Sequence, residues 1–141
     1  MKSKFLLPAI TVLFLSATSF AQDHVVGESF GGGIIFYLDS SGQHGLIADT
    51  LDQKKANWPD AINNCKELRD CEYTDWHLPS KDEADLLYMQ KKLFEGTLKD
   101  GVYWTSTERR SGYAWVMFTI GGTMIFSKEA EIHGVRAVRS F

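Results

Sequence analysis

The chain has 141 residues, of which 44% are hydrophobic and 23% are charged, a balance typical of globular proteins that excludes a disordered polymer. No collagen-like triplet, heptad array or tandem repeat is present, which excludes rod-like and solenoid folds. The formal net charge of −3 argues against general nucleic-acid binding, and the length predicts a single domain.

The first segment, residues 1–21, has the layout of a secretory signal peptide. Two lysines precede an apolar run at residues 5–15, and residues 19–21 resemble a cleavage site. A transmembrane anchor is the alternative, which the shortness of the run disfavours. Removing the two lysines from the 15 basic residues leaves 13 against 18 acidic ones, a net charge of −5. We therefore expect an exported single domain, residues 22–141, found in the periplasm, at the cell surface or in the medium.

A β-hairpin is predicted next. Residues 34–38 form a run typical of a buried strand, residues 39–42 are turn material, and residues 46–48 form the second strand. The glycine triplet at 31–33 precedes a strand rather than following one, so it predicts a turn or bulge and not a phosphate-binding loop. Residues 49–55 are polar and predict a loop.

Two helices follow the hairpin. Asn57 is a typical N-cap, with proline and aspartate in the first turn after it. Ser80 and Glu83 form a capping box for the second helix. We expect the apolar face of that helix to include Leu87, widened by neighbours such as Met89.

The two cysteines, Cys65 and Cys71, are predicted to form a short-range disulfide in the oxidising compartment of an exported protein. It would join the end of the first helix to the following loop and stabilise the fold by about 2–3 kcal/mol. The pair lacks the Cys-x-x-Cys spacing of redox motifs and has no flanking zinc ligands. We expect no metal and no cofactor.

The last forty residues predict four strands, at 103–107, 113–120, 124–127 and 135–141. Strands thus gather at both ends of the chain with two helices between them. This order predicts an α+β fold with a mostly antiparallel sheet. Arg136 and Arg139 stand in the apolar final strand, and we expect them to pair with Asp75 or Glu108 inside the fold.

A candidate ligand-binding surface combines cations with aromatic rings around one turn. Aromatic residues make up 13% of the chain, including four tryptophans. Any single tryptophan is more easily explained as core, but an exposed ring beside an arginine is typical of a binding surface. The candidate residues are Trp104, Glu108, Arg109, Arg110, Tyr113 and Trp115.

No catalytic residue is assigned. Asp75, His77 and Ser80 have the composition of a catalytic triad but not its spacing, and Ser80 is better explained as a helix cap. Paired carboxylates for glycoside hydrolysis would require the fold to bring two acidic residues together. A hydrolase is therefore the least favoured interpretation, and we expect no enzymatic activity.

Five motifs follow one another through the chain: GIIFYLD at 33–39, GQHGLIA at 42–48, DWHLPSKDE at 75–83, YWTSTE at 103–108 and VRAVRSF at 135–141. This series resembles the DUF1566 family, the C-terminal domain of the Legionella collagen-like protein. The resemblance implies a C-type-lectin-like fold in exported bacterial proteins. In the collagen-like member, it also implies adhesion and glycosaminoglycan binding.

The chain departs from the family pattern in two respects. It has no collagen-like repeats, so the trimeric stalk is not implied, and it carries His77 where the family usually has arginine. It also lacks the tripeptides that bind sugar and calcium in lectins. We expect a secreted, non-enzymatic module that binds a glycan, a glycosaminoglycan or another surface polymer. The alternative is an envelope module that binds protein partners; the sequence leaves the oligomeric state open.

Overall fold

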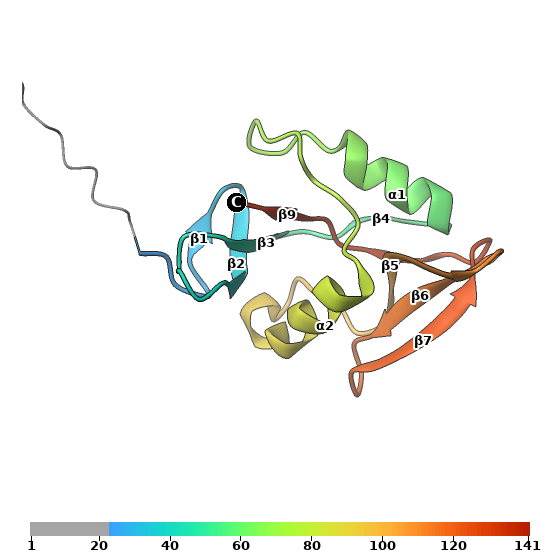
Figure 1. The fold of residues 1–141 in the computed structure, drawn as a ribbon. Coiled ribbons are helices and arrows are strands. Elements are labelled where there is room, and N and C mark those ends of the chain that lie inside the picture. Colours follow the sequence, from blue (N-terminus) through green and yellow to red (C-terminus); the bar gives the residue numbers. More distant parts are fainter. Residues whose placement is uncertain (1–22) are drawn as a thin grey trace, which may run out of the picture.

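The computed structural model describes residues 23–141, which form two β-sheets, two α-helices and one short 3-10 helix (Figure 1). The predicted signal peptide, residues 1–21, lies outside the described residues. Across residues 23–141, no helix has both the length and the apolar character needed to cross a membrane.

The first sheet joins the beginning of the described chain to its end. Its strand order is β1-β2-β3-β9, and all its pairs are antiparallel. The strands are β1 (Ser29–Phe30), β2 (Gly33–Leu38), β3 (Gly45–Asp49) and β9 (Val138–Ser140). The pairing of β2 with β3 confirms the predicted hairpin.

The second sheet has the strand order β4-β8-β5-β6-β7. Its strands are β4 (Gln53–Ala56), β8 (His133–Val135), β5 (Val102–Arg110), β6 (Tyr113–Phe118) and β7 (Thr123–Lys128). Within residues 23–141, the pair of β5 with β8 is the single parallel one. The fold is therefore α+β with mostly antiparallel sheets, as the order of elements predicts.

Two predicted elements are wrong. Residues 49–55, predicted as a loop, contain most of β4, and the predicted final strand is divided into β8 and β9, which lie in different sheets. Strand β4 is held by pairing with β8, far along the chain, and its own pattern shows no apolar alternation. Arg136 and Ala137 carry the chain from one sheet to the other between β8 and β9.

The helices begin as predicted. In α1 (Trp58–Glu67), Asn57 Oδ1 accepts a hydrogen bond from the Asp60 backbone N–H, and in α2 (Lys81–Met89) both bonds of the Ser80–Glu83 capping box are present. The 3-10 helix η1 (Lys91–Phe94) follows. Met89 is 76% exposed, so its predicted place on the apolar face is wrong. It lies two residues beyond buried Leu87, about 200° around the helix.

The glycine triplet forms a turn, as predicted. Gly31 and Gly32 have φ values of 58° and 89°, in the left-handed region that favours glycine, and they connect β1 to β2. Gly33 begins β2, where a Cβ atom would clash with the carbonyl oxygen of Ala48. The close approach of two strands therefore requires glycine at this position.

The core is divided between the two helices. Helix α1 packs on β4 and β5, while α2 packs on β2, β5 and β6 (Figure 1). Trp76 and Trp104 are at most 2% exposed and belong to the cluster that includes Ala61 and Cys65 of α1. Two of the four tryptophans are therefore wholly core residues, and Trp58 is partly buried against the same cluster.

Candidate functional site

The predicted ligand-binding residues divide between the core and the surface. Trp104 is 1% exposed, and its indole N–H donates to the Ala56 carbonyl oxygen over 2.8 Å. Because α1 and α2 both pack on β5, the first part of the strand is buried on both faces. Trp104 is therefore a core residue, and its predicted place on the ligand-binding surface is wrong.

The other five predicted residues lie at the end of β5 and the start of β6. Glu108, Arg109 and Arg110 are exposed, whereas Tyr113 and Trp115 are half-buried. The two strands are joined by a turn at Ser111 and Gly112, and the β5–β6 register shifts between Glu108 and Arg110. Such irregularities redirect side chains, and here both arginines lie against aromatic rings.

Arg109 is placed over two rings. Its guanidinium carbon lies 5.4 Å from the ring centroid of Trp115 and 4.9 Å from that of Phe126. These rings face the same side because Trp115 pairs with Phe126 across β6 and β7. The Lys81 ammonium, from the first turn of α2, lies 5.2 Å from the Trp115 ring, and the Arg110 guanidinium lies 4.4 Å from that of Tyr113.

We call these residues the cation–aromatic surface: Lys81, Arg109, Arg110, Tyr113, Trp115 and Phe126. No carboxylate of residues 23–141 forms an ion pair with Arg109 or Arg110. A ring face attracts a cation without using its N–H donors, so both guanidiniums keep their charge and hydrogen-bonding capacity. The rings hold the cations in place, and the surface presents exposed guanidiniums without a carboxylate partner among the described residues.

Sequence reasoning missed two members of this surface. Phe126 is 45% exposed, and only the register of β6 against β7 places it opposite Trp115. Lys81 is far from Trp115 in the sequence and reaches it because α2 packs on β6. Neither residue has a local signal that could have indicated its position.

Arg139 pairs with Asp75, as predicted. Its Nε and Nη2 atoms donate to the two carboxylate oxygens over 2.8 and 3.1 Å, and Nη1 donates to the Gly31 carbonyl oxygen over 3.0 Å. The hydrogen bonds from Arg139 hold the pKa of Asp75 below its usual value. This arginine joins the turn before β2 to the loop before α2.

Arg136 has a different partner from the one predicted. It pairs with Asp52 rather than with Asp75 or Glu108, and its Nε donates to Asp52 Oδ1 over 2.8 Å. Its Nη1 and Nη2 atoms each donate over 2.7 Å, to the carbonyl oxygens of Asp49 and Thr97. The predicted partners were wrong because β4, which follows Asp52 directly, was expected to be part of a loop.

The predicted disulfide between Cys65 and Cys71 is absent, and both cysteines are free. Cys65 faces the core from α1, where burial raises the pKa of its thiol to about 12. Cys71 is exposed in a left-handed conformation with a φ of 49°, after Leu68 has already ended the helix in extended backbone. Because the helix ends between the two cysteines, the Cys65 thiol lies in the core and the Cys71 thiol lies at the surface.

The residues with a triad-like composition serve to begin α2. The Ser80 hydroxyl accepts the Glu83 backbone N–H, and Glu83 Oε2 accepts the Ser80 backbone N–H over 2.8 Å. His77 Nε2 lies 3.2 Å from both oxygens of the same carboxylate. This contact raises the pKa of His77, while the contacts with His77 and Ser80 lower that of Glu83. Ser80 is thus a helix cap, as predicted. Nowhere in residues 23–141 are three His, Cys, Asp or Glu side chains grouped to hold a metal ion.

Comparison with known proteins places the chain in a family. No curated protein matches it. Among solved structures, the crystal structure of botrocetin is similar, with 18% sequence identity, coverage of 81% of this chain and 93% of that chain, and a TM-score of 0.45. The sequence matches the family of the Lcl C-terminal domain over residues 39–139, a span that includes β3 to β8, both helices and the cation–aromatic surface. The chain therefore belongs to the Lcl C-terminal domain family.

Proposed function

We propose that this chain is an exported, non-enzymatic binding module with a C-type-lectin-like fold, and that its cation–aromatic surface binds an anionic glycan or another acidic surface polymer. The observation that carries the proposal is the position of Arg109. Its guanidinium lies over Trp115 and Phe126 and has no carboxylate partner in the described chain.

The chemistry of the ligand follows from the donors that remain available. A guanidinium can donate two parallel N–H bonds to one sulfate or carboxylate group. Because the rings already restrict Arg109 and Arg110, less side-chain freedom is lost when a ligand orders them. Lys81 adds a third cation near the Trp115 ring, although its ammonium also pairs with the Asp85 carboxylate over 3.8 Å. A polymer with repeated negative charges matches this arrangement better than a neutral sugar.

The charge of the whole domain limits the strength of this binding. Residues 22–141 carry 18 acidic against 13 basic residues, so a polyanion is attracted only by the local group of cations. Exposed charges interact over about 8 Å at physiological ionic strength. We therefore expect weak binding that salt readily abolishes.

The test is retention on a heparin resin, with a glycan array to identify further ligands. The parent is expected to be retained at low salt, and the Arg109→Ala Arg110→Ala double variant to flow through. Lys66→Ala Arg69→Ala is the matched control, because it removes two exposed cations at the end of α1 and lowers the net charge equally. Equal elution of all three proteins, together with an array that shows no ligand, would contradict the proposal.

An envelope protein partner is the second candidate. The observation that favours it is the exposure of Ile125 and Phe126, which are 43% and 45% exposed on the edge strand β7. An edge strand with apolar side chains can add a strand from another protein. Co-purification of one protein from periplasmic or surface fractions, lost in an Ile125→Lys variant and kept in the double arginine variant, would favour this candidate over the glycan.

A further inference from the structure

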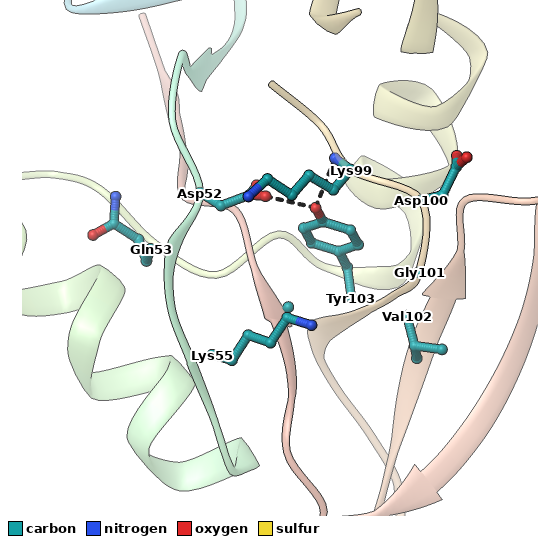
Figure 2. Close-up of a pocket in the computed structure, with 9 residues that line it drawn as sticks. Asp52, Gln53, Lys55, Lys99, Asp100, Gly101, Val102 and Tyr103 are labelled. Atoms are coloured by element: carbon teal, nitrogen blue, oxygen red, sulfur yellow. Dashed lines mark hydrogen bonds between the residues drawn. The ribbon is translucent and has the colours of Figure 1, made fainter. Parts of the chain in front are cut away.

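A pocket with a volume of about 240 Å³ lies away from the cation–aromatic surface, between β4, β8 and the loop that leads into β5 (Figure 2). Its lining includes Asp52, Gln53, Lys55, Lys99 and Tyr103. None of these residues belongs to the cation–aromatic surface. The volume is below the roughly 300–1,000 Å³ typical of pockets for drug-sized molecules, so a fitting ligand is smaller.

One side of the pocket is a fixed hydrogen-bond network. The Tyr103 hydroxyl donates to Asp52 Oδ2 over 2.6 Å and accepts the Lys99 backbone N–H over 3.0 Å (Figure 2). Asp52 Oδ1 accepts from Arg136, whose side chain is 1% exposed. The buried guanidinium therefore neutralises the Asp52 carboxylate, and Tyr103, itself 4% exposed, fixes its orientation.

The remaining charge of the pocket is positive. Lys55 enters from β4 and Lys99 from the loop before β5, and Figure 2 shows both side chains directed towards the space around Tyr103. Neither ammonium forms a hydrogen bond or an ion pair with another residue between 23 and 141. Asp100 also lines the pocket, but its carboxylate pairs with Lys91 over 3.1 Å. Two lysines thus approach one small space without a counter-charge.

We propose that this pocket binds a small hydroxylated carboxylate. The carboxylate of the ligand lies between the ammonium groups of Lys55 and Lys99, where it supplies the missing counter-charge. Its hydroxyls donate to the remaining lone pairs of Asp52 and Tyr103, whereas the Gln53 amide is already held by Asp49, to which its Nε2 donates over 2.7 Å. A plain inorganic anion would meet only the two lysines, whereas hydroxyls can also use the remaining lone pairs of Asp52 and Tyr103, so the hydroxyls distinguish the ligand.

The test is an NMR titration of the chain 22–141 with sodium D-glucuronate at constant ionic strength. We expect saturable shifts of the Gly101 and Gly134 amides, which line the pocket. D-Glucose tests the need for the charge, and acetate tests the need for the hydroxyls. Both are expected to bind at least about tenfold more weakly, the factor that corresponds to the loss of about 1.4 kcal/mol.

Two double variants separate the pocket from general charge effects. Lys55→Gln Lys99→Gln is expected to weaken glucuronate binding at least tenfold. Lys54→Gln Lys92→Gln, which removes two exposed lysines outside the pocket, is expected to bind like the parent. The proposal is overturned by the absence of saturable shifts, by equal binding of glucose, or by equal losses in the two variants.

The inference stands independently of the cation–aromatic surface. The Arg109→Ala Arg110→Ala variant keeps every residue that lines the pocket, so it is expected to bind glucuronate like the parent. Loss of heparin retention with intact glucuronate binding would separate two sites. Loss of both in the same arginine variant would instead contradict the pocket as a site of its own.

Discussion

Two regions of this molecule use arginine in opposite ways. In the segment from β8 to β9, Arg136 and Arg139 are 1% and 7% exposed and each forms an ion pair with a carboxylate. Arg139 also lies over an aromatic ring, with its guanidinium carbon 3.8 Å from the ring centroid of Tyr73. At the end of β5, Arg109 and Arg110 are exposed and lie over aromatic rings without a carboxylate partner among residues 23–141. The same side chain stabilises the fold in one region and remains available to a ligand in the other.

The partner decides which role is possible. A carboxylate cancels the charge of a guanidinium and accepts one or two of its N–H bonds, while backbone carbonyls accept others from Arg136 and Arg139, which are buried away from any ligand. An aromatic ring attracts the cation but accepts none of its in-plane N–H bonds. The segment β8–β9 joins two sheets and needs fixed contacts, whereas the end of β5 extends beyond the core. This difference leads to four predictions, in decreasing order of expected effect.

Arg136→Ala is expected to give the largest loss of stability. The change leaves the Asp52 carboxylate without its cation and the carbonyl oxygens of Asp49 and Thr97 without donors. Breaking a buried pair by removing one partner costs about 3–5 kcal/mol in the free energy of unfolding. Urea denaturation measures this difference. A variant that unfolds at the same urea concentration as the parent would show that Arg136 does not hold the two sheets together.

Arg139→Ala is expected to cost less, although it loses as many polar contacts. The Asp75 side chain is 52% exposed, so water replaces the lost N–H donors once the guanidinium is gone. We expect a loss of about 1.5–2 kcal/mol, the lower part of the range for hydrogen bonds to charged groups. The same urea experiment applies. A loss equal to that of Arg136→Ala would mean that solvent does not reach Asp75.

Local signals explain which parts of the fold could be predicted. Asn57 and the Ser80–Glu83 capping box act within four residues, so the sequence shows where both helices begin. Strand β4 and the division of the last strand depend on pairing between distant segments. The strand Gln53–Ala56 has no alternation of apolar and polar residues that could indicate a strand. Pairing with a distant strand holds it in place.

The candidate site shows the same limit. Arg109, Arg110, Tyr113 and Trp115 are close in sequence, and their proximity alone indicated a shared surface. The burial of Trp104 depends on the packing of α1 on β5, which no local pattern reveals. The pocket residues Lys55 and Lys99 come from segments on either side of both helices. Only the folded chain brings them together.

His77→Arg tests a cation that differs from the arginines of both regions, because a histidine is charged only at low pH. The carboxylate of Glu83 raises the pKa of His77 above its usual 6.5, so the stabilisation is complete below pH 6.5 and is lost as the pH rises through the raised value. The pKa of Glu83 is lowered from 4.5, so its contribution is present above pH 4.5 and is lost as the pH falls through the lowered value. Both contributions are therefore complete between pH 4.5 and 6.5.

Arginine keeps its charge throughout this range. The parent is expected to lose stability relative to His77→Arg between pH 6.5 and 8, by at most about 1 kcal/mol because the pair is partly exposed. Urea denaturation at several pH values measures the difference. Burial lowers the pKa of His133, so this residue destabilises the fold as the pH falls, but equally in both proteins. Parallel pH profiles for parent and variant would show that the His77–Glu83 contact contributes nothing.

The Arg109→Ala Arg110→Ala variant is expected to have the smallest effect on stability, within about 0.5 kcal/mol, as is usual for exposed substitutions. The lost attraction to the rings of Trp115 and Tyr113 is offset by the removal of repulsion between two adjacent cations. The same variant is expected to lose its retention on heparin. Arg136→Ala, by contrast, is expected to lose mainly folding stability. An arginine pair that is neutral for folding and decisive for binding would establish the contrast between the two regions. A loss of several kcal/mol would instead mean that the cation–aromatic surface stabilises the β5–β6–β7 sheet.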